Sequence, residues 1–261
     1  AILGKEEWEN RWKQAADSVK KKIREYLWSE ELGMCLDRDR NHAVMPVKMH
    51  NTLRAMYWNS ISQDMVDRFA REHLLNPEEF WTKMPLPSVA VNDPLFRNVT
   101  TNNWSGQAEA LTYQRAILAL ENYGYEWIQP LLGRKLFEAI GEKCVFVQQY
   151  DPFTGKPSAV SLEGEQDAYG PAMLSVLEYA ARMYGVHREH NMLYWGCCHG
   201  TDSSYEQYFG ENTYLLKNSG NSTEAYINGK KIFTTDKNAR VITDMTGQIL
   251  AVRSFDAPIT L

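Results

Sequence analysis

The residues of this chain best suited to chemistry lie in one short polar stretch, CVFVQQYDPFTGKPS, which begins at Cys144. Gln148, Gln149, Tyr150 and Asp151 stand next to one another there, just before a Pro-x-Thr-Gly turn. The turn is expected to present these residues at the end of an extended segment. Amide, carboxylate and aromatic groups together can hydrogen-bond to a polar ligand and stack on it. A hydrogen-bonded surface turn is the simpler alternative, and the local sequence leaves both open.

Two further segments place an acidic residue close to the expected start of a helix. In NNWSGQAEAL, Trp104 precedes a Ser-Gly pair, and Glu109 falls in the first helical turn with Gln107 nearby. In EGEQDAYGPA, Asp167 comes just before a helix that opens at Tyr169. Each carboxylate could act as a catalytic acid or base. Each could equally be a structural residue that complements the helix dipole.

The sequence does not contain the other common catalytic and metal-binding patterns. His187, His190 and His199 lack the partner spacing of a metal site. The four cysteines show no metal-ligand spacing either, and we interpret them as free buried thiols. There is no glycine-rich phosphate loop, no nucleophilic serine elbow and no Cys/His signature. We therefore expect neither a metal nor a cofactor.

Composition places the chain among ordinary globular proteins. It has 261 residues, of which 44% are hydrophobic and 23% charged, with a net charge of -5 and a pI near 5.8. The acidic balance and the absence of long like-charge runs argue against nucleic acid or a membrane surface as partner. No apolar run approaches the length of a bilayer helix and the N-terminus shows no signal-peptide pattern, so the compartment stays open. The 8 tryptophans and 14 tyrosines suit sugar rings as well as a core.

The elements that must position these residues are predicted to be mostly helical. Apolar residues recur at three- and four-residue steps, as in Trp8, Trp12, Val19 and Ile23. Three prolines interrupt residues 81–105, which we predict to be a long ordered loop, and loops of this length are usually functional. The predicted helices cover residues 5–29, 48–58, 62–75, 106–123, 126–141 and 169–184.

After residue 193 the pattern changes from helical to strand periodicity. Short β-branched or aromatic runs alternate with SGN, NGK, DKN and TGQ turns. We therefore predict a helical domain, residues 1–192, and a small antiparallel β module, residues 193–261. Helices joined by connections of alternating length suit helical hairpins stacked around an axis, so the predicted fold class is mainly α.

The order of these motifs resembles that of the six-hairpin toroid glycoside hydrolases. LNPEEFW and MPLPSVAVNDPLF are followed by NNWSG at a helix start, by ALENYGY at its end, and then by QQYDPFTG and a helix with an aromatic start. The resemblance is to the C-terminal half of enzymes such as mannosylglycerate hydrolase and processing α-glucosidase, with trehalase and glucoamylase more distant. It covers residues 5 to 185, and its motifs are specific in order and spacing although each alone is weak.

This resemblance implies both a fold and a reaction. The fold is an (α/α)6 toroid, of which this chain would form a part, followed by the β module. Because a partial barrel exposes apolar helix faces, a missing N-terminal segment or a homo-oligomer partner is expected to cover them. The reaction is inverting hydrolysis by two carboxyl groups. The segment that carries the general acid in the family has no match here.

The family's general base maps onto Gln148, and an amide there cannot accept a proton from water. Glu109 stands where the family usually has a tryptophan, so we expect a relocated base, with Glu109 as the first choice and Asp167 as the second. The base would be partly buried yet ionised, held by Trp104 or Gln107. The side chains expected to stack on the sugar or bond its hydroxyls are Trp81, Trp104, Gln107, Gln148, Gln149, Tyr150, Asp151 and Tyr169.

Three functions are compatible with the sequence. The first is a glycoside hydrolase that acts on a non-reducing-end sugar, α-linked by the same resemblance. The second is a carbohydrate-binding pseudoenzyme or scaffold that has lost its base, favoured by Gln148 and the unmatched acid. The third is a helical interaction domain whose aromatic residues are all core, which leaves the loop at 81–105 and the QQYDPFTG turn without a purpose. We expect the first, with a carbohydrate as the partner.

Overall fold

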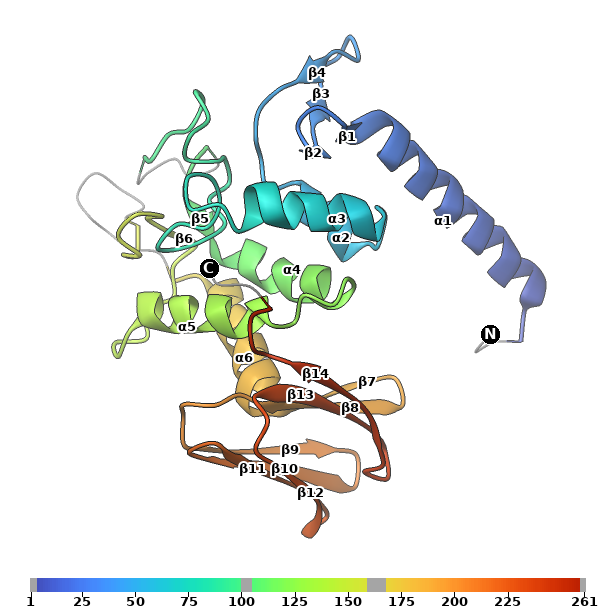
Figure 1. Ribbon diagram of the computed structural model, residues 1–261, viewed down its shortest axis with the longest axis vertical. Coiled ribbons are helices and arrows are strands. Elements are labelled where there is room, and N and C mark those ends of the chain that lie inside the picture. The colour runs from blue at the N-terminus through green and yellow to red at the C-terminus, as the bar shows by residue number, and fades with distance from the viewer. Residues whose placement is uncertain (1–3, 100–104, 159–167, 259–261) are drawn as a thin grey trace.

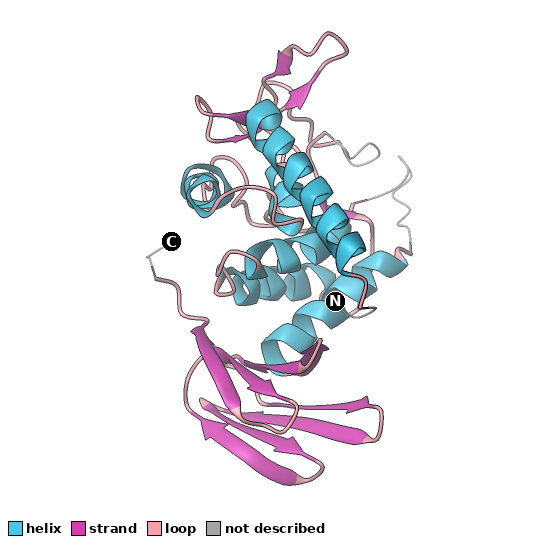
Figure 2. Ribbon diagram, turned by 90° about the vertical axis from the view of Figure 1, so that its right-hand side faces the viewer, coloured by secondary structure: helices cyan, strands magenta, loops and turns pink. Residues whose placement is uncertain are grey.

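The computed structural model describes residues 4–99, 105–158 and 168–258. Helices and their connecting loops make up one part of the molecule, and two β-sheets packed below them make up the other (Figures 1 and 2). One hydrophobic core lies among the helices and loops, and a second lies between the sheets. The described residues for which the sequence predicts a function all belong to the helical part.

The helical part is built around a row of three neighbouring helices, α2, α4 and α6, with α5 packed against α4 and α6. One side of α4 is buried, including Ala110, Tyr113, Ala116 and Leu120, and none of its other residues is fully exposed, so this helix is fixed in the core. The helices are α1 (Glu6–Leu27), α2 (Thr52–Tyr57), α3 (Gln63–Phe69) with the π-helical turn η1 (Ala70–Leu74), α4 (Ala110–Glu121), α5 (Ile128–Ile140) and α6 (Gly170–Tyr184).

The start of α4 differs from the helix that periodicity predicts at residues 106–123. The helix begins at Ala110, because Ala108 and Glu109 form the short strand β5 (Ala108–Glu109) instead. This strand pairs with β6 (Gln149–Tyr150), which comes from the polar stretch singled out in the sequence. A tertiary pairing has therefore overridden helix propensity at the point where the candidate residues meet.

Helix α1 stands apart from the rest of the molecule (Figure 1). It is amphipathic, and its first turn carries Glu6, Glu7 and Glu9, which complement the helix dipole. None of its residues is buried, however, and its apolar side faces α2 across an open groove. The periodicity of the sequence predicted this helix correctly.

The long loop before α4 is ordered and buried through most of its described part. Residues 84–90 are all buried, although they belong to no helix. The backbone N–H of Ser88 donates to the carbonyl of Gln107 at 3.1 Å, and that of Ala90 donates to the carbonyl of Lys48 at 2.8 Å. These bonds satisfy the buried backbone and fix the loop beside β5, as expected for a loop that positions a site.

Two antiparallel four-stranded sheets form a sandwich below the helices (Figure 2). The strand orders are β12-β11-β10-β9 and β14-β13-β8-β7, and α6 packs against β8. The rings of Trp195, Tyr214 and Phe233 meet between the sheets.

Strands thus form a larger share of the fold than a mainly α chain with a small β module would have. They are β7 (Val186–Glu189), β8 (Met192–Cys197), β9 (Ser203–Phe209), β10 (Asn212–Ser219), β11 (Ser222–Ile227), β12 (Lys230–Thr235), β13 (Ala239–Asp244) and β14 (Ile249–Ser254), besides the short ladders β1 (Trp28–Ser29) with β2 (Met34–Cys35) and β3 (Asp37–Arg38) with β4 (Val44–Met45).

Arg240 in β13 joins the sandwich to the helices. Its side chain is only 1% exposed, and its guanidinium donates to the Glu121 carboxylate and to the Gln129 side-chain carbonyl, both at 2.6 Å. The same Glu121 carboxylate pairs with Arg182 of α6 at 3.2 Å. Because Glu121 is the last residue of α4, this buried cluster fixes the sandwich at the C-terminal end of that helix.

The cysteines carry no cross-link. All four are free, and only Cys144 is exposed. Within the described ranges the side chains of His, Cys, Asp and Glu form no group of three that could hold a metal ion. The helices of the same ranges include none that is both long and apolar enough to cross a membrane.

Candidate functional site

The pairing of β5 with β6 collects four of the predicted site residues on one side of a small ladder. Glu109 lies directly opposite Gln149 in the antiparallel register. Side chains alternate between the two faces of a strand, so Gln107 and Asp151, two residues away on either strand, share this face. We call this side of the ladder the polar face. The sequence had singled out all four residues, but not their pairing.

The polar face contains three buried polar atoms that lack a hydrogen-bond partner among the described residues. They are the Oε1 of Gln107, the Oε1 of Glu109 and the Nε2 of Gln149. A buried polar atom without a partner costs about 1–3 kcal/mol, so native structures rarely leave several at one place without a purpose. Two acceptors and one donor gathered on one face indicate a site that a polar ligand completes.

The environment of Glu109 brings its pKa close to neutrality. The side chain is 4% exposed, and this burial raises the pKa of the carboxyl group to about 7, although the positive charges of Arg115 and Arg54 act to lower it. A carboxyl group with such a pKa exchanges its proton in the range where general acids and bases work best.

A cavity of about 310 Å³, which the sequence did not predict, lies between residues of α2 and α4. Glu109 is not among the residues that line it, but two of those residues, Arg54 and Arg115, are close enough for their charges to lower the pKa of Glu109. Trp58 is 71% exposed there and offers a free ring face. The i, i+4 spacing of Arg54 and Trp58 shows only that they share one side of a predicted helix, and only the fold places them opposite α4. The cavity is lined by Arg54, Tyr57, Trp58, Gln114 and Arg115.

Asp151 makes several hydrogen bonds within the protein. Its Oδ1 accepts hydrogen bonds from the backbone N–H of Phe153 at 2.9 Å and of Thr154 at 2.7 Å. Its Oδ2 accepts one from the Nδ2 of Asn98 at 2.7 Å. Both carboxylate oxygens are therefore already used within the protein, whereas the sequence predicted that Asp151 would bond sugar hydroxyls.

Tyr150 lies on the side of the ladder away from the polar face. Its ring is fully buried in the helical core together with Ala108. The hydroxyl group donates to the carbonyl of Val145 and accepts from the N–H of Val147, each at 3.4 Å. The ring of Tyr150 is therefore not on the polar face, where the stacking role expected for it would place it.

Gln148 and Tyr169 flank the ladder. Gln148 is half-buried, and its carbonyl accepts a hydrogen bond from the N–H of Ala110 at 3.1 Å, which ties it to the start of α4. Tyr169 is the half-buried N-cap residue of α6, and its N–H donates to the carbonyl of Phe146 at 2.9 Å. Both are thus held close to the ends of the elements that carry the polar face.

Of the remaining candidates, only one lies within the described residues. Trp81 is half-buried against the helical core, and the Nζ of Lys135 in α5 lies 5.9 Å from the centre of its ring. These contacts are with α5 and the helical core. Trp104 and Asp167 both fall outside the described residues.

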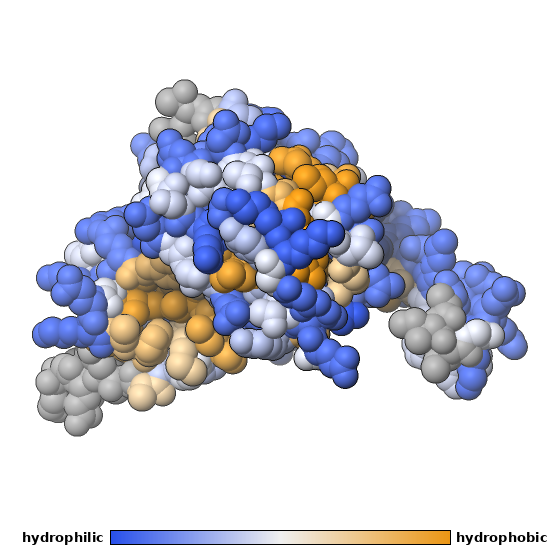
Figure 3. All heavy atoms as spheres, turned by 90° about the horizontal axis from the view of Figure 1, so that it is seen from below, coloured by the Kyte–Doolittle hydropathy of each residue, from blue (hydrophilic) through white to orange (hydrophobic). Residues whose placement is uncertain are grey.

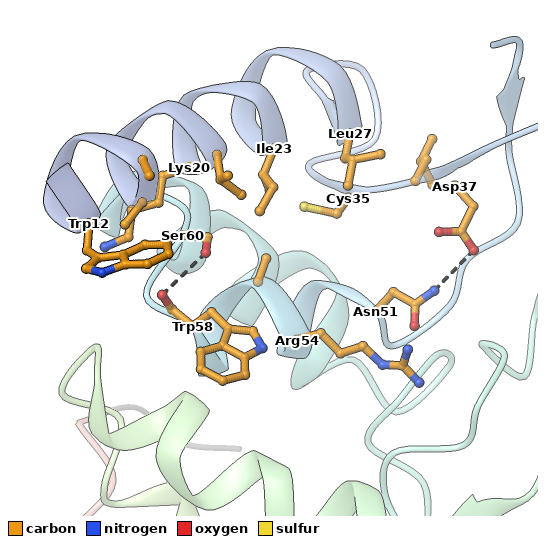
Figure 4. Close-up of a pocket in the computed structure, with 15 residues that line it drawn as sticks. Trp12, Lys20, Ile23, Leu27, Cys35, Asp37, Asn51, Arg54, Trp58 and Ser60 are labelled. Carbon is orange, nitrogen blue, oxygen red and sulfur yellow. Dashed lines mark hydrogen bonds between the residues drawn. The ribbon is translucent and has the colours of Figure 1, made fainter.

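An apolar groove of about 630 Å³ separates α1 from α2 (Figure 4). Ile23 and Leu27 of α1 point into it, Cys35 lies below them, and Trp12 and Trp58 lie at one end. Burial raises the pKa of the Cys35 thiol to about 11, so the floor of the groove is uncharged at neutral pH.

A second apolar surface lies at the other end of the α2–α4–α6 row. Met173, Leu174 and Leu177 of α6 are exposed at helical spacing. Seen from below, hydrophobic residues likewise form separate patches on a surface that is otherwise largely hydrophilic (Figure 3). The row of helices therefore ends in an uncovered apolar surface on both sides.

A family of known proteins matches this chain by sequence. The sequence model of the "Mannosylglycerate hydrolase MGH1-like glycoside hydrolase domain" matches residues 1–169. A comparison of the sequence with curated proteins gives no match.

Solved structures share the fold at low sequence identity. A mannosylglycerate hydrolase of Thermus thermophilus in complex with glucose is similar with a TM-score of 0.50 and 21% identity, over 59% of this chain and 37% of its own. The neutral trehalase of Saccharomyces cerevisiae is similar with a TM-score of 0.52 and 20% identity, over 64% of this chain and 30% of its own. A structure named "Sialidase" covers 92% of this chain, and 24% of its own, with a TM-score of 0.70 and 13% identity. The match to this chain thus spans between 24% and 37% of the length of these three proteins.

Proposed function

The chain belongs to the mannosylglycerate hydrolase MGH1-like glycoside hydrolase family, and we propose that it hydrolyses an α-glycosidic bond at a non-reducing-end sugar. In this proposal the mechanism is inverting, and it uses one carboxylate as a base that activates water. Glu109 is that base. No cofactor takes part.

The observation that supports this proposal is the environment of Glu109. Its carboxyl group has a pKa of about 7, and its Oε1 is buried without a hydrogen-bond partner among the described residues. An ionised carboxylate with a free acceptor atom can hold a water molecule and remove its proton. The nearby Nε2 of Gln149 is a free donor that could orient the same water or a sugar hydroxyl.

The neighbouring cavity offers the groups that sugar recognition needs. Its volume of about 310 Å³ is at the small end of the range for ligand pockets, which suits a single hexose. The exposed ring of Trp58 can stack on the apolar side of a sugar, and Arg54, Gln114 and Arg115 can bond its hydroxyls. The sugar would then lie between the cavity and the polar face.

Gln148 takes a binding role in this proposal. It stands at the position that corresponds to the family's general base, yet an amide cannot accept the proton of an attacking water. Its backbone carbonyl accepts from the N–H of Ala110, so the backbone of Gln148 lies next to the residue that follows Glu109. The loss of a carboxylate at 148 and the gain of one at 109 are therefore proposed to be two parts of one change.

The general acid is proposed to come from helices that complete the toroid. The groove between α1 and α2 and the exposed side of α6 are the two open ends of the helix row. We propose that further helical hairpins of the same toroid cover both. Such hairpins would bring the second carboxyl group opposite Glu109, and Asp167 is the alternative within this chain.

A carbohydrate-binding pseudoenzyme is the second candidate. It is favoured by the amide of Gln148 and by the fact that Glu109 is the one carboxylate of the polar face with an unused oxygen among the described residues. In that case the polar face and the cavity would bind a sugar and release it unchanged.

Glycosyl fluorides allow the base to be tested in this chain alone, because fluoride departs without a strong general acid. We would measure fluoride release from α-mannosyl and α-glucosyl fluoride by the wild type, Glu109→Gln and Gln148→Glu, with the exposed Glu142→Gln as the matched control. Glu109→Gln should lower the rate by about 100-fold or more, and the control should leave it unchanged. Activity that survives Glu109→Gln, or that first appears with Gln148→Glu, would refute this base assignment.

Binding is measured in parallel through tryptophan fluorescence, with mannose and glucose as probes. Binding without fluoride release would favour the pseudoenzyme. If neither sugar changes the fluorescence and neither fluoride is cleaved, both candidates fail.

A further inference from the structure

We infer that Asp151 sets the direction in which Gln107 offers its side-chain amide, acting through Asn98. The result is that Gln107 presents its carbonyl oxygen, and not its NH₂ group, on the polar face. Asp151 is thus a positioning residue, two hydrogen bonds away from the group that it orients. The geometry of this relay does not depend on the proposed function, but its role in choosing a sugar hydroxyl rests on it.

The relay starts from a carboxylate that cannot rotate. The Oδ1 of Asp151 accepts from the N–H groups of Phe153 and Thr154, so the turn itself holds the side chain in place. Burial acts to raise the pKa of Asp151, but the hydrogen bonds from Asn98 and from the turn outweigh it and bring the pKa below its ordinary value. The residue is therefore ionised at neutral pH, and an ionised carboxylate only accepts hydrogen bonds.

Each following step is fixed by the one before it. Because the Oδ2 of Asp151 can only accept, Asn98 must turn its NH₂ group toward it, at 2.7 Å. The Oδ1 of Asn98 then faces the other way and accepts from the Nε2 of Gln107 at 3.1 Å. With its nitrogen used, Gln107 is left with its Oε1 on the polar face, where that atom is buried and has no partner among the described residues. The hydrogen-bond partners therefore determine which end of each amide is the oxygen and which is the nitrogen.

Gly106 makes the relay possible by allowing a close backbone approach. A Cβ atom at this position would lie 2.3 Å from the carbonyl oxygen of Arg97, a distance that no side chain tolerates. The N–H of Arg97 also donates to the carbonyl of Ser105 at 2.9 Å. The segment that carries Asn98 is therefore held against the segment that carries Gln107.

The consequence is a polarity pattern that a ligand must match. Gln107 offers an acceptor, and Gln149 on the opposite strand offers a donor. A sugar hydroxyl can satisfy either, but at Gln107 it must donate. A fluorine atom in place of that hydroxyl cannot donate, so it would leave the Oε1 of Gln107 unpaired in the complex.

The relay can be tested by changing which side chains at positions 151 and 98 donate and which accept. Asp151→Asn keeps the turn, because the remaining oxygen is still needed by the N–H groups of the turn, but it turns an NH₂ group toward Asn98. Two NH₂ groups cannot bond, so Asn98 reverses and Gln107 reverses with it. Combining Asp151→Asn with Asn98→Asp makes residue 98 an acceptor toward both neighbours, so Gln107 again donates to it and again presents its carbonyl oxygen on the polar face. A purely structural turn has no reason to respond in this way.

The first measurement needs no ligand. In the ¹H–¹⁵N spectrum, the side-chain NH₂ signal of Gln107 is assigned by its loss in Gln107→Met. We expect that signal to shift in Asp151→Asn and to return toward its wild-type position in the double variant. An unchanged signal in Asp151→Asn, or no recovery in the double variant, would overturn the relay.

The second measurement uses glucose and its deoxyfluoro derivatives as probes, read by tryptophan fluorescence. In the wild type, one fluorinated position should weaken binding by about tenfold. That penalty should disappear in Asp151→Asn and return in the double variant. If it stays in Asp151→Asn, Gln107 does not read this hydroxyl. If the NH₂ signal behaves as expected but no sugar binds to any variant, the relay stands and the proposed function is what fails.

Discussion

Glu109 and Gln149 lie directly opposite each other across the β5–β6 pair, yet the Oε1 of the glutamate and the Nε2 of the glutamine are both left without a hydrogen-bond partner among the described residues. Two groups that could bond to each other are instead held as a free acceptor and a free donor. Such an arrangement makes the charged form of Glu109 expensive in the free protein. It also makes the site ready for a ligand that supplies the missing bonds.

The raised pKa of Glu109 predicts that the protein loses stability as the pH rises from about 4.5 to about 7. In this window the folded protein keeps a proton that the unfolded chain releases, so the free energy of unfolding falls with pH. The loss approaches about 3 kcal/mol above pH 7. In Glu109→Gln this fall should be absent. Urea unfolding midpoints at pH 4.5 and pH 8 measure it.

The control for this pH effect is Glu142→Gln, which changes an exposed carboxylate outside the site. It should retain the fall in stability seen in the wild type. If Glu109→Gln shows the same pH dependence as the wild type, the Glu109 carboxyl does not carry a raised pKa. Its selection as the base would then lose its main support.

Gly106 provides a test of how closely the site is packed. In Gly106→Ala the new Cβ meets the carbonyl oxygen of Arg97, and backbone cannot move aside as a flexible side chain can. We expect a destabilisation of about 2 kcal/mol and a loss of sugar affinity of about tenfold or more. Gly170→Ala is the matched control, since a Cβ there meets nothing within 4 Å. Thermal unfolding measures the stability of both variants and fluorescence titration measures their sugar affinity. Equal stability and affinity in the two variants would contradict the close packing at Gly106.

Glu121 predicts how strongly the sandwich is joined to the helices. Glu121→Gln removes the charge that balances Arg240, whose guanidinium is almost fully buried. Breaking a buried ion pair in this way should lower the free energy of unfolding by about 3 kcal/mol. Glu224→Gln, at the more exposed pair with Lys231, should have a much smaller effect. Denaturant unfolding measures both, and similar losses would show that the junction is held by other contacts.

The helices and the candidate site residues could be picked out from the sequence because each carries a local signal. The three- and four-residue apolar steps of α1 are visible in the sequence, and so is the amide-rich stretch that contains Gln149. The pairing of Glu109 with Gln149 carries no such signal, since it joins segments far apart in the chain. Strand formation at Glu109 also runs against the helical pattern of its neighbours, so periodicity alone placed it in the first turn of α4.

The buried position of Tyr150 could have been predicted from the sequence. Neighbouring residues of a strand point to opposite faces, so Gln149 and Tyr150 could not both face a ligand. Applying that rule would have placed Tyr150 in the core, where the structure has it. Arg54 and Arg115, in contrast, could not have been found, because their distance from Glu109 depends on how α2 packs against α4.

The uncovered ends of the helix row predict how the 261-residue chain behaves in solution. Trp12 in the groove and Leu177 on α6 are 61% and 57% exposed, and each belongs to a larger apolar surface. Soluble monomers rarely expose such surfaces, so we expect the chain to bind the dye ANS or to self-associate. Trp12→Lys combined with Leu177→Lys should reduce both effects without changing the circular dichroism spectrum. Tyr208→Lys, at an exposed ring on the far sheet, should not.

The outcome of this experiment bears on the proposed toroid. A wild-type chain that remains monomeric in light scattering and binds no ANS would show that neither apolar surface needs a cover. The proposal that further helical hairpins dock there would then have no physical basis, and the general acid would have to be sought within this chain. Association that the paired lysine variant abolishes, and that Tyr208→Lys does not, would instead show that both ends of the row are incomplete. That is the property expected of one arc of a ring.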